Sequence, residues 1–129
     1  MSNKAKGSRV ERELLSLLTE NGWRALRVAG SGVNDDSPCD LMAAKMGQKP
    51  CTIEVKSSKK TSIYIKKSQI NDFILFSSMM GLTPVIAVRF NHQGWLFISP
   101  DQLSDSGKSW VISLEKARSE GKKFGQFFG

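Results

Sequence analysis

The spacing of apolar residues changes along this chain between the period of a helix and that of a strand, and this change limits the possible fold. Val10, Leu14 and Leu18 recur three or four residues apart, which predicts a helix over about 9–21. A second helical pattern covers about 68–80 and is followed by a glycine. Strand-like segments lie between and after them, so the sequence predicts an α/β fold, a sheet with helices packed on it.

The predicted strands are short and bounded by turn residues. They cover 23–29, 41–44, 51–56, 84–90 and 95–98. Turn residues separate the second from the third and the fourth from the fifth, so we expect two hairpins. Residues 30–37 and 57–67 are interpreted as a polar and a basic loop, and after Ser99 only 113–120 has helical composition. The predicted order is α-β-β-β-α-β-β.

The length of 129 residues, without a repeat or linker, predicts a single domain over 1–129. Its first seven residues are expected to form a mobile basic arm. With 40% hydrophobic and 24% charged residues, the composition excludes a disordered or membrane protein. No apolar run approaches the roughly 20 residues that span a bilayer. We therefore expect an intracellular, cytoplasmic protein.

Cysteine and histidine are too scarce for several kinds of site. Cys39 and Cys51 cannot form a disulfide framework, and with His92 they do not complete a four-ligand zinc site. We expect both thiols to be reduced and structural. His92 lies in a predicted turn, which argues against nucleophilic catalysis with a histidine base. In an enzyme of this composition, carboxylates and lysines would carry the chemistry.

The formal net charge of +7 favours a polyanionic partner, nucleic acid first. The basic residues cluster in two stretches of the sequence, although a charge run is often only a solvated surface. The clustered positions are Lys4, Lys6, Arg9, Arg12, Arg24, Arg27, Lys59, Lys60, Lys66 and Lys67. A surface that neutralises several phosphates needs several such cations.

The first predicted hairpin gathers two carboxylates and a lysine. A turn near residues 47–48 would place Leu41 roughly opposite Glu54, which brings Asp40 close to Glu54. Glu54 and Lys56 project from the same face of their strand because side chains alternate. Two nearby carboxylates suit a hard cation such as Mg²⁺, and the lysine could orient a water or hold a phosphate oxygen. The alternative is a surface ion pair with a turn at Asp40, and spacing alone favours neither.

The same residues carry a resemblance to a nuclease superfamily. Pro38-x-Asp40, thirteen further residues and Glu54-x-Lys56 resemble the P-D-(D/E)-x-K signature of the restriction-endonuclease-like nucleases. In that superfamily an acidic residue on the preceding helix often joins the metal site. Glu11 is the candidate for that residue here.

A longer set of ordered segments is similar to the archaeal-type Holliday junction resolvases and covers about residues 6–98. The segments are Lys6–Leu14, Leu26–Gly32, Ile53–Ser57, Ile63–Ile65, Phe76, Val85–Phe90 and Trp95. The resemblance implies a restriction-endonuclease-like fold with a mixed sheet of about five strands. It also implies a Mg²⁺-dependent homodimer that cuts two opposed strands of a four-way DNA junction, with Mn²⁺ able to substitute for Mg²⁺ and no small-molecule cofactor or membrane partner.

The resemblance also implies roles for single residues. Glu11, Asp40 and Glu54 would be metal ligands assisted by the Val55 carbonyl. Lys56 would serve the attacking water, Ser31 would lie at the active-site loop, and Arg12 and Arg27 would contact phosphates. The residues expected at the DNA surface are Lys6, Arg9, Arg12, Arg27, Lys59, Lys60, Tyr64, Lys66 and Lys67.

Several of these residues have a structural alternative. Ser8 and Glu11 match a capping box, which would make the glutamate a helix cap. Ser31, between two glycines, is by default a loop residue. Tyr64 lies between two isoleucines and is more easily interpreted as core than as a base-stacking residue. The phenylalanines of 124–128 would cover either their own sheet or a partner subunit.

The prediction from the sequence is thus a single-domain nuclease that resolves four-way junctions as a homodimer. One alternative is a related nuclease that acts on other DNA structures. The other is a non-catalytic basic module that binds structured nucleic acid. Acids facing phosphates are of no use to a simple binder, and this favours the enzyme.

Overall fold

A computed structural model describes residues 3–28 and 37–129, with side chains from Arg9 onward. Its main sheet has five strands in the order β1-β2-β3-β5-β6. They are β1 (Arg24–Arg27), β2 (Leu41–Ala44), β3 (Cys51–Ser58), β5 (Thr83–Phe90) and β6 (Trp95–Ile98). Only β3 and β5 run parallel, and the other neighbours are antiparallel. The predicted mixed sheet of about five strands and both predicted hairpins are confirmed.

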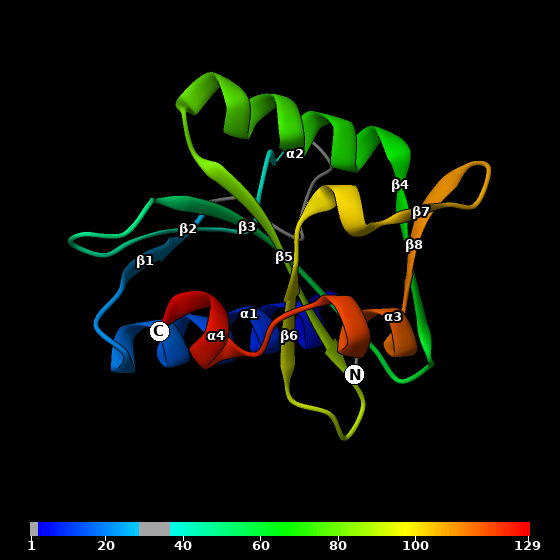
Figure 1. Ribbon diagram of the computed structural model, residues 1–129, viewed down its shortest axis with the longest axis horizontal. Coiled ribbons are helices and arrows are strands. Elements are labelled where there is room, and N and C mark those ends of the chain that lie inside the picture. The colour runs from blue at the N-terminus through cyan, green and yellow to red at the C-terminus, as the bar shows by residue number, and fades with distance from the viewer. Residues whose placement is uncertain (1–2, 29–36) are drawn as a thin grey trace.

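Helices cover both faces of this sheet (Figure 1). One face carries α1 (Asn3–Glu20) and the short C-terminal α4 (Phe124–Phe128), whereas α2 (Lys67–Met80) lies across the other. The alternation along β3 divides its side chains between them, since Ile53 belongs to the core beside α1 and Thr52 contacts Ser77 of α2. Glu54 therefore faces α2. Gly81 ends this helix in the left-handed conformation, as predicted.

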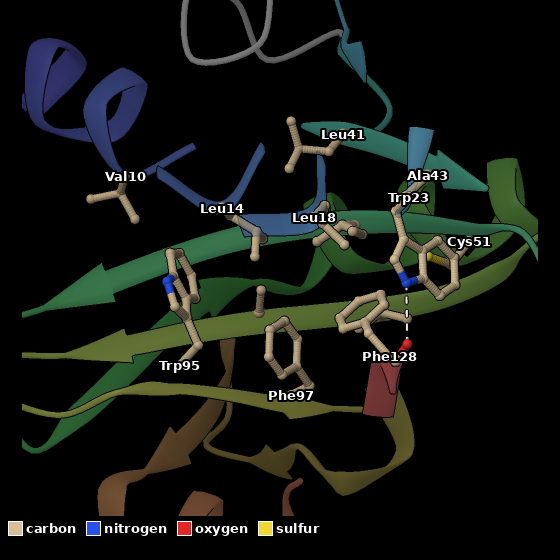
Figure 2. Packing of buried hydrophobic residues seen from close by; sticks show 13 residues of the cluster. Val10, Leu14, Leu18, Trp23, Leu41, Ala43, Cys51, Trp95, Phe97 and Phe128 are labelled. Carbon is tan, nitrogen blue, oxygen red and sulfur yellow. Dashed lines mark hydrogen bonds between the residues drawn. The ribbon is translucent and has the colours of Figure 1, made fainter. Parts of the chain in front are cut away.

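The core beside α1 is completed by the C-terminal aromatic residues (Figure 2). Phe128 is buried, with its ring edge-on to those of Trp23 and Phe97. The indole Nε1 of Trp23 donates a hydrogen bond of 3.1 Å to the Phe128 carbonyl. The sequence allowed this tail to cover either its own sheet or a partner subunit, and Phe128 covers its own sheet.

A second, three-stranded sheet was not expected from the sequence. It has the order β4-β8-β7 and lies on the α2 side of the molecule (Figure 1). Its strands are β4 (Ser62–Lys66), β7 (Ser104–Asp105) and β8 (Ser109–Ser113). A short 3₁₀ turn (Pro100–Gln102) precedes β7, and α3 (Leu114–Glu120) follows β8, close to the predicted helix over 113–120.

The predicted basic loop over 57–67 is wrong, because β3 continues to Ser58 and β4 follows after three residues. In β4 the two isoleucines are buried and the residues between and after them face solvent. Tyr64 is 65% exposed, so the core position expected for it is also wrong. The alternation was visible in the sequence, but the aromatic residue lies on its polar face.

The first helix begins earlier than predicted. It starts at Asn3 instead of about residue 9, so the arm expected over 1–7 is wrong for residues 3–7, while residues 1–2 lie outside the described part. A single glycine costs a helix only about 1 kcal/mol, so Gly7 does not end it. Ser8 then lies inside the helix and cannot be its N-cap. The capping explanation for Glu11 is removed.

The remaining local predictions are mixed. Cys39 and Cys51 are buried free thiols, as expected. The strand predicted over 23–29 is found only over Arg24–Arg27, since residues 23 and 28 are not part of it. Residue 29 lies outside the described part. In the part of the chain that is described, no helix is both long and apolar enough to span a membrane.

Candidate active site

The hairpin of β2 and β3 places Asp40 beside Glu54. Leu41 lies opposite Ile53, one residue from the expected register. The Asp40 N–H donates to the Ile53 carbonyl at 3.0 Å, and the Val55 N–H donates to Asp40 Oδ2 at 2.8 Å. The backbone of β3 thus fixes the aspartate carboxylate at the edge of β2, and the predicted closeness of the two acids is confirmed.

Glu54 and Lys56 project from the same face of β3, as predicted from strand alternation. Lys56 Nζ lies 3.6 Å from Glu54 Oε2. Both side chains also contact Gln69 on α2, whose Nε2 donates to Glu54 Oε2 at 2.5 Å and whose Oε1 accepts from Lys56 Nζ at 3.3 Å. One amide therefore holds the acid and the lysine in a fixed relation.

Gln69 was missed in the reasoning from sequence, although a signal was available. It lies in the first turn of α2, four residues before Phe73, which is fully buried against the sheet. Residues four apart share a helix face, so the glutamine had to point toward the sheet. Gln69 could have been found by looking for a polar residue among the sheet-facing positions of the helix that packs on a strand with charged residues.

The pKa of Glu54, which lies beside Asp40, is unusually high for a carboxyl group. Glu54 is 3% exposed, and its burial, followed by the nearby Asp40 carboxylate, raises its pKa from 4.5 to about 8, although Lys56 acts in the opposite direction. Burial and the same two acids raise the pKa of the Cys39 thiol to about 12. The site concentrates negative charge in a place poor in water, and a bound cation would relieve it.

Glu11 lies on α1 and is buried, with 5% of its surface exposed. Its Oε1 is 3.4 Å from the Nε of Arg27 on β1, so that arginine is drawn into an ion pair. Among the described residues, no three acidic, histidine or cysteine side chains lie close enough together to hold one ion. The structure brings Asp40 and Glu54 together and keeps Glu11 outside this pair.

The donor set nevertheless fits a hard divalent cation. Carboxylate oxygens from Asp40 and Glu54 are the ligands that such ions prefer, and Mg²⁺ commonly needs only one or two carboxylates because it keeps several waters. The raised pKa of Glu54 is what a buried carboxylate beside a second one would show in the absence of a cation.

The predicted DNA residues fall into three groups. Arg9, Arg12, Lys59, Lys60, Tyr64 and Lys66 are exposed. Lys67 is engaged, because its Nζ pairs with Asp105 at 2.7 Å and lies 4.8 Å from the centre of the Trp110 ring. The side chain of Lys6 lies outside the described residues, and so does Ser31, which was predicted at the active-site loop and not at the DNA surface.

Comparisons with known proteins agree with this geometry. Residues 2–128 match the family described as archaeal Holliday junction resolvase (Hjc). The chain is 44% identical over 108 residues to the crossover junction endodeoxyribonuclease Hjc of Methanocaldococcus jannaschii, covering 83% of this chain and 75% of that protein. It is 33% identical to the Archaeoglobus fulgidus enzyme of the same name, covering 98% and 97%.

The fold agrees as well. The solved structure of Archaeoglobus fulgidus Hjc, a Holliday junction resolvase, superposes with a TM-score of 0.82 at 28% identity, covering 94% of this chain and 93% of that one. This confirms the predicted restriction-endonuclease-like fold. Nucleases of this kind depend on a divalent metal and act on branched DNA. The chain therefore belongs to the archaeal Holliday junction resolvase family and is an endodeoxyribonuclease, as the ordered segments of its sequence predict.

Proposed function

We propose that this chain resolves four-way DNA junctions by Mg²⁺-dependent hydrolysis of two opposed strands. The observation that carries the proposal is the centre formed by Asp40, the buried Glu54 and Lys56 on the sheet of a resolvase fold. A module that only binds DNA would gain nothing from two acids held together near its basic surface. We also propose that residues 1–129 form one nuclease domain that works inside the cell, with its DNA.

The roles proposed for the residues are those that the family resemblance implies, and the described contacts support some of them. Asp40 and Glu54 would hold the metal with the Val55 carbonyl, and Glu11, which lies outside this pair and contacts Arg27, is proposed as a further ligand on the family resemblance alone. Mg²⁺ is the cation proposed, with Mn²⁺ able to substitute; it supplies a water of lowered pKa and offsets the charge that develops on the phosphate. Lys56, steadied by Gln69, would hold the attacking water or a phosphate oxygen. Ser31 is proposed at the active-site loop.

The basic surface around this centre would hold the DNA backbone. Its proposed members are Lys6, Arg9, Arg12, Arg27, Lys59, Lys60, Lys66 and Lys67, with Tyr64 available for stacking. Several cations are needed because each neutralised phosphate releases counterions. Arg27 would act chiefly by holding Glu11, to which it is already paired.

A cleavage assay tests the function directly. The protein is incubated with a synthetic four-way junction or the matched linear duplex, with Mg²⁺ or with a chelator. We expect paired cuts in two opposed strands of the junction alone, and only with metal. Cutting of both substrates at equal rates would favour the alternative nuclease that acts on other DNA structures. No cutting with Mg²⁺ or Mn²⁺ would leave only the binding module.

A homodimer follows from the paired cuts, because two opposed strands require two centres and the described chain supplies one. The outer side of α2 offers a surface for the second copy. It exposes Ile74, Leu75, Met79 and Met80, which are four of the seven exposed large apolar residues in the described part of the chain. Such a patch on a soluble domain marks an interaction site.

Charge placed on this helix should separate the two copies. Leu75 and Met79 are 58% and 77% exposed and lie one helical turn apart, so L75K/M79K should leave the fold intact. Light scattering should show the mass fall from dimer to monomer, with loss of paired cuts. E20K, on the exposed end of α1, serves as the control and should remain dimeric. A monomeric wild type would refute the dimer, and a dimeric double variant would refute this surface.

A further inference from the structure

A small basic pocket lies outside the Asp40–Glu54 centre, at the carboxyl ends of the parallel strands β3 and β5. Its volume is about 180 Å³. The charged and polar residues that line it are Arg9, Ser57, Ser58, Lys59, Arg89, Asn91 and His92. In open α/β sheets the carboxyl ends of parallel strands are where ligands bind. Ser57, Arg89, Asn91 and His92 take no part in the proposed metal centre.

The pocket has a fixed floor. Ser57 pairs with Arg89 across the parallel strands, and the Asn91 N–H donates to the Ser58 carbonyl at 2.8 Å. This bond ties the start of the β3–β4 loop to the β5–β6 hairpin, which Figure 1 shows at the end of the molecule near the N-terminal part of α1. The backbone needed for a binding site is therefore already in place.

The most buried cation of the pocket is also held in position. Arg89 forms an ion pair with Glu13 of α1, and its guanidinium carbon lies 5.7 Å from the centre of the Trp95 ring. The ion pair uses one of its nitrogens, and a guanidinium has five N–H donors. An arginine that is oriented in this way loses little side-chain freedom when it binds an anion.

The lining selects the ligand class. Three cations, two serine hydroxyls and an asparagine amide point to an anion with several acceptor oxygens, and none of the lining residues is acidic. The volume is below the roughly 300 Å³ at which pockets for drug-sized molecules begin. A single phosphate group fits these limits, whereas a nucleoside does not.

The distance along β3 between the pocket and Glu54 indicates which phosphate of the DNA the pocket would bind. Ser57 and Ser58 follow Glu54 by three and four residues, which is roughly 10–13 Å along a strand. Neighbouring phosphates of one DNA strand lie farther apart than the axial rise of about 3.4 Å, because the backbone winds around the axis, so this distance spans only a few nucleotides. We propose that the pocket binds one backbone phosphate of the junction, a few nucleotides from the bond that is cut. This inference rests on the proposed function.

The test combines two changes, the removal of one phosphate charge from the DNA and the removal of cations from the pocket. Binding is measured with the D40N variant in chelator, so that no DNA is cut. The ligands are junctions that carry one uncharged methylphosphonate at each successive position near the cut. We expect one position, a few nucleotides from the cut, to weaken binding about threefold or more and to lower the slope of log affinity against log salt by about 0.9.

The same substitution should then have a clearly smaller effect in the double variant R9A/K59A, because two of the three pocket cations, Arg9 and Lys59, are gone and only Arg89 remains. Both side chains are exposed, so the fold should be retained, and melting curves would verify this. K49A removes one exposed lysine in the turn at the opposite end of β3 and should keep the full position effect.

The outcomes separate the two proposals. If R9A/K59A keeps the same position effect as its parent, or if no position stands out, the phosphate pocket is refuted even though the junction is bound and cut. If wild-type protein with Mg²⁺ leaves the junction uncut, the proposed function falls. The position effect in D40N then still decides whether the pocket binds a phosphate.

Discussion

Replacing Asp40 by Asn, or Glu54 by Gln, should lower the rate of junction cutting by at least about 10²–10³-fold, the range for loss of one group that stabilises transition-state charge. The two acids are brought together by the hairpin, and Val55 N–H anchors Asp40 at 2.8 Å. An amide keeps the size of the side chain but not its charge, so the divalent cation loses a ligand while the fold is preserved. The measurement is single-turnover cutting of a labelled four-way junction with Mg²⁺.

Junction affinity should stay unchanged or increase in both variants. Neither acid is expected to contact a phosphate favourably, and removing negative charge near DNA reduces repulsion. E115Q, at an exposed carboxylate on α3, is the matched control and should cut normally. Loss of binding together with cutting would mean that the acids hold the fold and do not carry the chemistry.

The parts of the fold that could be predicted are those set by local pattern. The hairpin around residues 46–50 and the end of α2 at Gly81 depend on turn chemistry and on one left-handed residue, and both were found. The small sheet was missed because its edge strand has only two residues and β8 lies in a weakly patterned region. Its pairing joins β4 to β8 across more than 40 residues, which local periodicity does not show.

The candidate site could be predicted for a similar reason. Strand alternation places Glu54 and Lys56 together, and the hairpin brings in Asp40 even with the register one residue off. Spacing from the buried Phe73 places Gln69 on the sheet-facing side of its helix, but which strand residues it meets depends on the crossover between two parallel strands. The relation between α1 and β1, which pairs Glu11 with Arg27, is likewise tertiary and cannot be read from spacing.

The stability of the metal-free protein should fall as the pH rises from about 4.5 to about 8, because of Glu54. Its pKa is raised to about 8 in the folded chain from 4.5. In this window the folded state keeps a proton that the unfolded state has lost. The stabilisation is therefore fully present below pH 4.5 and is lost as the pH passes through 8. Because a tenfold change in proton affinity corresponds to about 1.4 kcal/mol, the loss of unfolding free energy is on the order of 2–5 kcal/mol.

The substitution that isolates this effect is Glu54→Gln. Glutamine carries no charge at any of these pH values, and its side-chain oxygen can still accept from Gln69 Nε2. Urea unfolding in chelator at pH 5 and pH 8.5 should show a large decrease for the wild type and a much smaller one for E54Q. E115Q, which alters an exposed carboxylate on α3, should follow the wild type.

Metal should reverse the loss, because a divalent cation binds the ionised pair and displaces the proton from Glu54. At pH 8.5, Mg²⁺ or Mn²⁺ should raise the midpoint of wild-type unfolding and have little effect on E54Q, since that variant lacks one of the two carboxylates. Parallel pH curves for the wild type and E54Q would show that Glu54 ionises without cost in the folded chain. The acid pair would then not be the strained, cation-seeking centre inferred from its burial.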